Sequence, residues 1–566
     1  MNTRVPKMGL VIASLIVVLV VSALSALLMQ SAHLPIEQLW QDPYLRHVTW
    51  FSFLQASLST VLSVGLAIPV AHALSRSQFR GRHVVLKIFS STLVLPVLVG
   101  VFGLLTIYGN RGYLASLLTT LGVEHSFSIY GLGGILLAHV FFNLPYAARL
   151  LLQSLESIPY EQHLLAAHLG MNSVEKFRTV EWPWLRQQVP AIAGLVFMLC
   201  FTSFATVMAL GGGPKSTTIE LAIYQAIKFD FDLATGAILA IWQMLLCGTM
   251  AIVLQKGQNA LPSNQGATPV EPVTQFQSSR AQHWNRVWIA VAIAFVIPPL
   301  LSVIHSGLNS QWFDVVSDSR YWQAMLNSFK VASLASVLAV CGAVFTQATS
   351  RYWRLRDHRK AADHLDLIAT IILVTPGLVL STGLFLLLRY WANAFDYAFE
   401  VVVLINGLMA LPYTVKSLAQ PMFKLEQDYQ YLCQTLGLTG WQRWCVVEWR
   451  ALRAPLAHAL AISFMFSLGD LSVVALFGSA DFATLPFYLY QLLGSYQTSA
   501  AAVVALTLLV LSLLCFTLSE QLLKKRTVQA PRSTKKARFT NGKTAKRNET
   551  TVLHSKTKSR GKDQLQ

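Results

Sequence analysis

The sequence has few charged residues and no pattern of paired cysteines. Asp, Glu, Lys and Arg make up 12% of its 566 residues, whereas a soluble domain has about 25%. The low charge excludes an ordinary soluble globular protein. Its six cysteines are scattered, which argues against a disulfide framework. The histidines, including His139 and His168, also lack metal-ligand spacing, so we expect no metal on this chain.

The sequence also lacks a phosphate-binding loop of the form GxxxxGK[ST]. The nearest text, GGGPKS at 211–216, has proline before the lysine, and we interpret it as a glycine turn. No nucleophile and base stand in a catalytic arrangement. We therefore expect no catalytic residue and no cofactor, and we predict that the chain is not an enzyme.

Long apolar runs dominate what is present. The mean hydropathy is +0.50, and 54% of the residues are hydrophobic. Each run is long enough to cross a hydrocarbon core of about 30 Å, and none alternates as in a barrel. The first run follows Arg4 and Lys7 like a signal peptide, but its length favours a membrane helix. We predict an all-α polytopic membrane protein with twelve spans, near 9–28, 52–75, 88–108, 129–150, 190–210, 233–255, 287–306, 323–348, 366–389, 398–418, 456–477 and 498–519.

Basic residues indicate the orientation. Arginine and lysine crowd the loops at 76–87 and 351–360, and such loops belong on the cytoplasmic side. Twelve spans then place both termini inside. Residues 520–566 carry 14 Lys or Arg against three acids, and we expect this polar tail to be disordered. Attraction to the membrane surface is its expected role; a nucleic-acid tail is a minor alternative.

Two segments of the chain repeat each other. Gly170–Arg186 reads GMNSVEKFRTVEWPWLR, and Gly437–Arg453 reads GLTGWQRWCVVEWRALR. Similarity continues around both, which indicates a duplication. Six spans per copy is an even number, so the copies are parallel repeats about an axis along the membrane normal. The predicted organisation is a first half at 1–255, a linker at 256–286, a second half at 287–519 and a tail at 520–566.

Each half contains a long polar loop, at 151–189 and at 419–455, placed on the same side of the membrane. Two equivalent helical patches suit a partner with two-fold symmetry. The alternative is a pair of helices that only lie on the inner leaflet.

The stretches LLAAHLG (164–170) and YLCQTLG (431–437) resemble the cytoplasmic loop of ATP-binding-cassette (ABC) importer permeases, which reads Glu-Ala-Ala, three residues, Gly. The glycines match, and Ala166 matches the second alanine, but Leu164 and Tyr431 replace the glutamate. The text VEWPWLR, the stretch LGGGPKSTTIELAIYQ and the fused halves are similar to the thiamine permeases of Gram-negative bacteria.

The resemblance implies the type I importer permease fold in the bacterial inner membrane, with alternating access driven by ATP. It also implies three partners: a homodimeric ATPase that binds the ATP, a periplasmic binding protein and the small-molecule substrate. Membrane lipid is the surrounding medium, and no nucleic acid is expected. The residues expected to couple the chain to the ATPase are Ala166, Ala167, Gly170, Phe177, Glu181, Leu432, Gly437, Trp444 and Glu448.

Asp470 is the clearest carboxylate within a span, and such groups are costly in a membrane. Its repeat partner is Phe204. A carboxylate and a ring near the axis suit a cationic, aromatic substrate, so both are candidates for the substrate pathway. The alternative is that Asp470 caps a broken helix. For the whole chain, a permease for ferric ion, sulfate or polyamine and an ion-coupled secondary transporter remain as alternatives.

Overall fold

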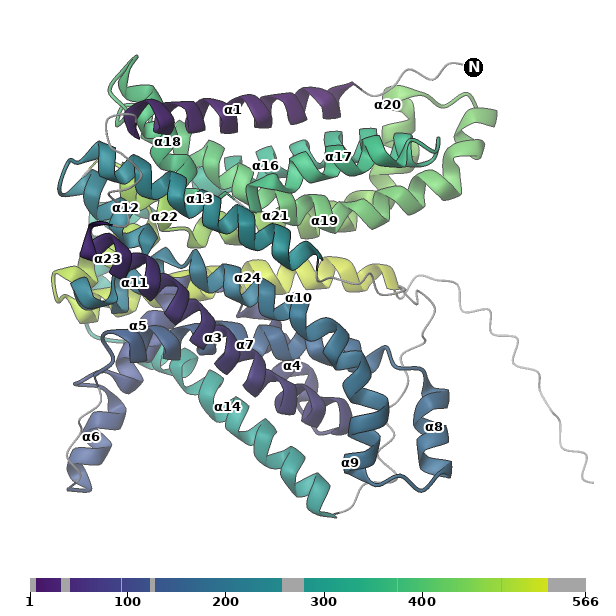
Figure 1. Cartoon of the computed structure of the whole chain (residues 1–566), viewed down its shortest axis with the longest axis horizontal. Helices are drawn as coiled ribbons and strands as arrows, with labels where there is room; N and C mark the ends of the chain where they lie inside the picture. The colour runs from purple at the N-terminus through teal and green to yellow at the C-terminus, as the bar shows by residue number, and fades with distance from the viewer. Residues whose placement is uncertain are drawn as a thin grey trace, which may run out of the picture.

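The computed structural model describes residues 7–31, 41–92, 94–122, 128–256, 279–373, 375–479 and 481–527. Within these residues every regular element is a helix (Figure 1). Eleven helices are long and apolar enough to cross a membrane. The remaining expected span, the ninth at 366–389, is present as two shorter helices, α17 (Arg359–Thr370) and α18 (Gly377–Arg389).

The two halves follow the same order of spans, although some short helices of one half have no described counterpart in the other. The first contains α1 (Met8–Ser31), α3 (Pro43–Arg76), α4 (Arg82–Ser91), α5 (Val97–Tyr108), α6 (Tyr113–Thr120), α7 (Leu132–Glu156), α10 (Trp182–Phe201), α11 (Phe204–Leu210), α12 (Ile219–Lys228) and α13 (Leu233–Lys256). The second contains α14 (Ser279–Gly307), α15 (Trp312–Ser317), α16 (Ser319–Arg354), α17, α18, α19 (Ala398–Thr435), α21 (Trp449–Gly469), α22 (Ser472–Phe477), α23 (Leu485–Gly494) and α24 (Thr498–Thr527).

Two helices extend past the predicted boundaries. Residues 279–286, assigned to the linker, form the start of α14, and residues 520–527, assigned to the disordered tail, form the end of α24. Neither stretch contains a proline or glycine that would end a helix. The rest of the linker after Lys256 and the tail from 528 onward lie outside the described residues.

Spans are interrupted at equivalent places in both halves. The third and ninth spans break before α5 and α18, where Pro96 and Pro376 precede the first helical residue. Proline lacks a backbone donor and clashes with the preceding turn, so it suits a helix start. The fifth span breaks between α10 and α11, and the eleventh breaks at Asp470 between α21 and α22. Discontinuous helices are typical of the substrate region of transporters.

The first helix of each half packs against the other half. Helix α1 contacts α16 and α18, and α14 contacts α3 and α5; the two lie at opposite edges of the bundle (Figure 1). Glycines allow these close approaches, because a Cβ on Gly383 of α18 would lie 2.7 Å from the Ala23 carbonyl oxygen. Gly103 of α5 lies against Pro299 of α14 in the same way. The halves therefore interlock.

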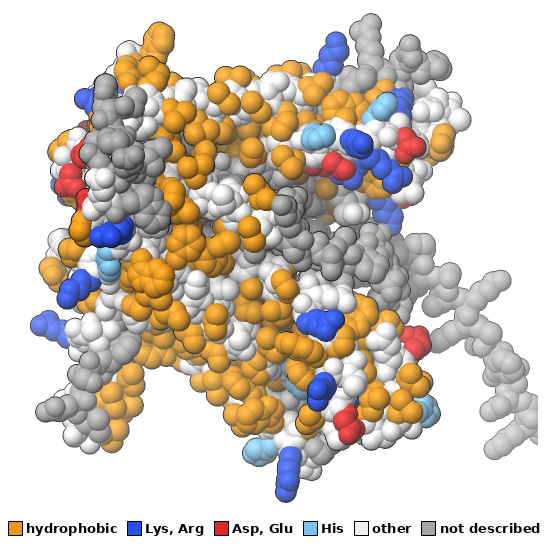
Figure 2. Space-filling view, viewed as in Figure 1, with side chains coloured by type: hydrophobic (Ala, Val, Ile, Leu, Met, Phe, Trp, Pro, Cys, Tyr) orange, Lys and Arg blue, Asp and Glu red, His pale blue; other side chains and the backbone are white. Residues whose placement is uncertain are grey.

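The outer surface of the bundle is apolar. In Figure 2, hydrophobic side chains cover the middle of the visible face, and most visible charged side chains lie toward the two ends of its long axis. Large side chains on the spans are exposed, including Val61 at 70%. Hydrocarbon is the solvent that suits such a surface.

Candidate functional site: two coupling loops

The two repeated loops lie at the same end of the bundle, at the right of Figure 1. The first holds α8 (Tyr160–His168), α9 (Ser173–Lys176) and a π-helical turn, η1 (Phe177–Glu181). The second holds the end of α19, then α20 (Gly440–Arg443) and a second π-helical turn, η4 (Trp444–Glu448). The sequence prediction of two loops on one side agrees with this placement.

The loops differ where the fourth and tenth spans end. In the first copy the helix stops after Glu156, and Pro159 precedes α8. In the second copy the matching residue is Glu426, and α19 continues without a break to Thr435. Proline removes a helix hydrogen bond, whereas glutamate favours a helix. This substitution between the copies accompanies the difference between a coupling helix that follows a break and one that continues the span.

The two helices that precede the repeated glycine end in the same kind of cap. Met171 N–H donates to the Ala166 carbonyl at 3.1 Å and Gly170 N–H to the Ala167 carbonyl at 3.1 Å. In the second copy, Leu438 N–H donates to Cys433 at 2.9 Å and Gly437 N–H to Gln434 at 3.2 Å. This is a Schellman cap, which needs a left-handed residue after the helix. The φ angles of Gly170 and Gly437 are 65° and 66°, so the cap explains the repeated glycine.

Replacing either capping glycine by alanine is expected to destabilise the protein by about 1–2 kcal/mol, because an L-residue is strained at positive φ. The cost is confined to the backbone, since a Cβ at either position would meet nothing within 4 Å. Gly65→Ala in α3 is the matched control, because Gly65 has equal space in a helix interior and alanine is favoured there. Thermal unfolding should separate the control from Gly170→Ala and Gly437→Ala; equal midpoints for all three would contradict this.

The π-helical turns set the direction of the repeated glutamates. Trp182 N–H donates to the Phe177 carbonyl five residues earlier, and Trp449 N–H donates to the Trp444 carbonyl. One extra residue per turn rotates the chain, and such turns are frequent at functional sites. Each turn ends at the glutamate of the repeated Val-Glu-Trp text, Glu181 or Glu448. Both glutamates point into the bundle.

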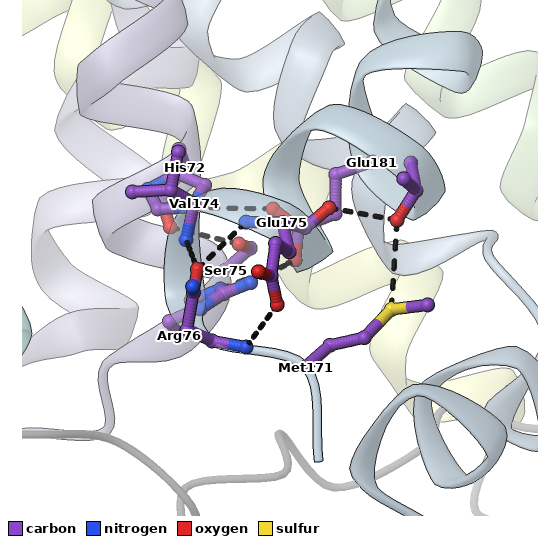
Figure 3. Close-up of polar contacts among 9 residues, drawn as sticks. His72, Ser75, Arg76, Met171, Val174, Glu175 and Glu181 are labelled. Carbon is purple, nitrogen blue, oxygen red and sulfur yellow. Dashed lines mark hydrogen bonds and ion pairs between the residues drawn. The ribbon is translucent and has the colours of Figure 1, made fainter. Parts of the chain in front are cut away.

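In the first copy, two residues at the end of α3 hold Glu181 (Figure 3). Arg76 donates from Nε and Nη2 to Glu181 Oε1, at 3.1 and 2.5 Å. His72 Nε2 lies 3.2 Å from Glu181 Oε2, and its ring meets Phe177 edge-on at 5.2 Å between centroids. Glu181 is 2% exposed and Arg76 is 9% exposed. The loop is thus fastened to the second span by a buried ion pair.

In the second copy the same fastening involves four charges. Arg351 Nη2, at the end of α16, donates to Glu448 Oε1 at 2.8 Å, and its Nε lies 3.3 Å from Glu426 Oε2. Arg443 Nε lies 3.0 Å from Glu448 Oε1, and Arg443 also pairs with Glu426. Glu426 is the residue that replaces Pro159 of the first copy. Glu426 therefore accounts for both the continuous helix and the larger ion network of the second copy.

Several residues expected to couple the chain to a partner thus face the protein interior. Glu181 and Glu448 are buried, and so is Ala166. Phe177 and Trp444 are half-buried and pack against the core, while Ala167 is half-buried. Burial and the nearby Lys176 charge lower the pKa of His163 on α8, which disfavours the charged form of its ring. These groups position the loops.

The exposed faces of the two loops carry apolar side chains at equivalent positions. We call these eight residues the coupling surface. The pairs, with first-copy and second-copy exposures, are Leu164 41% and Tyr431 71%, Leu165 60% and Leu432 51%, Leu169 64% and Leu436 63%, and Val174 74% and Trp441 76%. Among the residues expected from the sequence, Leu432 lies on this surface, and Gly170 and Gly437 are exposed beside it. Exposed apolar clusters mark interaction sites.

Sequence reasoning missed most of the fastening residues and most of the coupling surface. Arg76 and Arg351 had been used only as signs of the cytoplasmic side. Both arginines lie at the end of the second span of their half, and this shared position could have indicated their role in fastening the loops. The apolar residues at matching offsets, such as Leu169 and Leu436, were also visible in the repeat.

The structure places Asp470 at the break of the eleventh span. Its Oδ1 accepts from Ser472 N–H at 3.2 Å and its Oδ2 from Val473 N–H at 3.3 Å, as in the capping alternative. Gly469 beside it approaches Pro96 of the other half, where an added Cβ would lie 3.1 Å away. Phe204 is 2% exposed and contacts Tyr224, with ring centroids 5.3 Å apart. The break of the eleventh span therefore lies against the break of the third span at the interface between the halves, while Phe204 packs within its own half.

A second carboxylate of this region, Glu220 of α12, was missed by the sequence analysis. It is 3% exposed, accepts a hydrogen bond from Gln243 Nε2 at 3.1 Å and interacts electrostatically with Asp470. Glu220 falls between the predicted spans at 190–210 and 233–255, so the span pattern gave no sign that it is buried. The region between the halves therefore holds two acids.

Comparison with known proteins gives one family. Residues 339–528 match the family described as "Binding-protein-dependent transport system inner membrane component". The "Thiamine transport system permease protein ThiP" of Escherichia coli (strain K12) is 50% identical over 487 residues, which is 85% of this chain and 90% of that protein. The chain belongs to the ThiP family. The ThiP protein of Haemophilus influenzae is 40% identical over 504 residues, 89% of this chain and 93% of the relative.

A more distant relative is the "Fe(3+)-transport system permease protein FbpB 2" of Haemophilus influenzae. It is 22% identical over 349 residues, 61% of this chain and 67% of that protein. As a ThiP-family chain, the protein is a multi-pass inner-membrane permease of the ABC importer class with the type I importer fold. It is a transport subunit, as its relatives are.

Proposed function

We propose that the chain carries thiamine, or thiamine phosphates, across the inner membrane as the permease of an ATP-driven importer. The substrate is proposed from the ThiP relatives, which are named for thiamine. The ferric-ion alternative is less favoured because the iron permease is only 22% identical. The observation that carries the mechanism is the pair of equivalent coupling loops at one end of two interlocked halves.

In this proposal each copy of a homodimeric ATPase grips one half of the coupling surface. ATP binds to that ATPase, and this chain holds no cofactor. Closure of the ATPase pair moves α8 in one half and the end of α19 in the other. The buried pairs Arg76–Glu181 and Arg351–Glu448 pass this motion to the second and eighth spans. The halves then rock between two states, each favoured by different contacts.

The remaining assignments follow from this arrangement. A periplasmic binding protein delivers the substrate to the end of the bundle opposite the coupling loops. Both termini lie in the cytoplasm with those loops. An ion-coupled secondary transporter is disfavoured because the relatives belong to a binding-protein-dependent system. The proposal is tested by reconstituting the chain with its ATPase and binding protein and measuring ATP hydrolysis across thiamine, its phosphates, ferric ion, sulfate and a polyamine. Stimulation of ATP hydrolysis by a solute other than thiamine or its phosphates would overturn the proposed substrate assignment.

Asp470→Asn tests whether the broken spans hold the cationic substrate. Asparagine can still accept a backbone hydrogen bond through its single amide oxygen, so the variant removes the charge and keeps one of the two hydrogen bonds that Asp470 accepts. We expect the thiamine concentration for half-maximal transport to rise about tenfold, equivalent to about 1.4 kcal/mol. Asp318→Asn is the control, because Asp318 caps α16 in the same way. An unchanged concentration dependence in Asp470→Asn would remove this residue from the pathway.

A further inference from the structure

A long apolar groove runs along the second half and ends at its coupling loop. Its volume is about 950 Å³. Its walls come from α16, α21 and the end of α24, and its closed end comes from the second coupling loop. Along α21 the wall extends from Trp449 to Phe464, which is about 22 Å at 1.5 Å per residue. We call this the tryptophan groove, since Trp441, Trp444 and Trp449 line it.

The apolar part of the groove lies along membrane-spanning helices. Phe329 of α16 is 43% exposed, and Leu460 of α21 is 41% exposed. Both helices are long and apolar enough to cross a membrane, so the groove opens to hydrocarbon. A slot about 22 Å long exceeds one leaflet, about 15 Å of a 30 Å core. It therefore has room for an acyl chain.

The loop end of the groove differs in chemistry. Trp441 and Trp449 are 76% and 53% exposed, and tryptophan prefers the membrane–water boundary. Arg453 also lines the groove and is exposed. In the described part of the chain its guanidinium has no carboxylate within ion-pair distance.

Arg453 stands outside the ion network at this end of the groove. Glu426 and Glu448 are already paired with Arg351 and Arg443. The Arg453 guanidinium is then available to an anion, and arginine binds phosphate through several donors. An apolar groove, tryptophans at its loop end and a guanidinium outside the ion network are together the features of a binding site for an anionic lipid.

We propose that the tryptophan groove binds one anionic phospholipid, with an acyl chain between α16 and α21 and its phosphate on Arg453. Because Trp444 and Glu448 line the groove and also form η4, the lipid contacts the fastening of the second coupling loop directly. The first-copy residue that matches Arg453 is Arg186. It is not among the residues that line the groove. The proposal does not depend on the transported solute.

The test is lipid binding to the purified full chain by native mass spectrometry, with phosphatidylglycerol and phosphatidylcholine added separately. We expect Arg453→Gln to weaken phosphatidylglycerol binding about fivefold, as one basic residue contributes near an anionic surface, and to leave phosphatidylcholine binding unchanged. Arg186→Gln is the matched control and should bind like the wild type. Ala457→Trp, which fills the groove from α21, should weaken both lipids about tenfold.

Three results would overturn the proposal. The first is unchanged phosphatidylglycerol binding in both Arg453→Gln and Ala457→Trp. The second is tighter lipid binding by a chain truncated after Thr527. That result would mean that the residues beyond α24 occupy the groove and compete with the lipid. The third is a dimer of this chain whose formation displaces the lipid. Loss of transport in a variant that keeps its lipid would bear on the proposed function and leave the lipid site standing.

Discussion

Replacing Glu181 by alanine is expected to destabilise the protein by about 3–5 kcal/mol, the cost of breaking a buried ion pair by removing one partner. Arg76 is 9% exposed and donates twice to Glu181. His72 is the other residue that faces this carboxylate, and it cannot replace the lost negative charge. Thermal unfolding of the purified chain in detergent measures the effect.

The second copy supplies a matched comparison. Glu448→Ala removes one carboxylate from a network that keeps Glu426, which pairs with both Arg351 and Arg443. We therefore expect a smaller loss in the free energy of unfolding, about 1–3 kcal/mol, because the two arginines stay buried with one carboxylate fewer. The double variant Arg76→Met with Glu181→Met should recover most of the stability, because a buried pair replaced by apolar groups is often neutral. Equal melting of Glu181→Ala and wild type would show that this fastening contributes nothing.

Charged substitutions on the coupling surface are expected to abolish binding of the ATPase while the permease stays folded. Leu165 and Leu432 occupy equivalent positions and are 60% and 51% exposed. Each aspartate would place an unpaired charge in an apolar contact, and central contacts of this kind are worth about 2 kcal/mol or more. We expect Leu165→Asp with Leu432→Asp to weaken association at least 100-fold, measured by surface plasmon resonance on nanodiscs.

Single substitutions should show that the ATPase holds both loops. A dimer that grips two sites loses its avidity when either is removed, so each single variant should weaken binding by at least tenfold. Trp391→Asp is the control, because Trp391 is 87% exposed and follows α18, away from the coupling loops. If Trp391→Asp weakened binding as much as the double variant, the coupling surface would not be the docking site.

Much of the architecture was predictable from the sequence because it follows from local patterns. Apolar runs located the spans, the even number of spans per copy made the repeats parallel, and the repeated glycine marked an actual Schellman cap at Gly170 and Gly437. These features depend on residues close together in the chain.

The fastening of the loops was not predictable in the same way. Glu181 is 105 residues from Arg76, and Glu448 is 97 residues from Arg351. Nothing in either local stretch shows that they meet. Glutamates in a repeated polar loop therefore suggested a partner, whereas the fold buries them. Asp470 shows the opposite case, since the capping alternative considered for it involves only residues next to it in the chain.

The central claim is that the two copies present equivalent surfaces to one partner on one side of the membrane. Cysteines at positions 165 and 432 test it directly, in a chain whose exposed Cys341 and Cys445 are replaced by alanine. A membrane-impermeant maleimide should label both positions in inside-out vesicles and neither in right-side-out vesicles, and the ATPase should protect both. Labelling of the two positions from opposite sides, or protection of neither, would contradict the account.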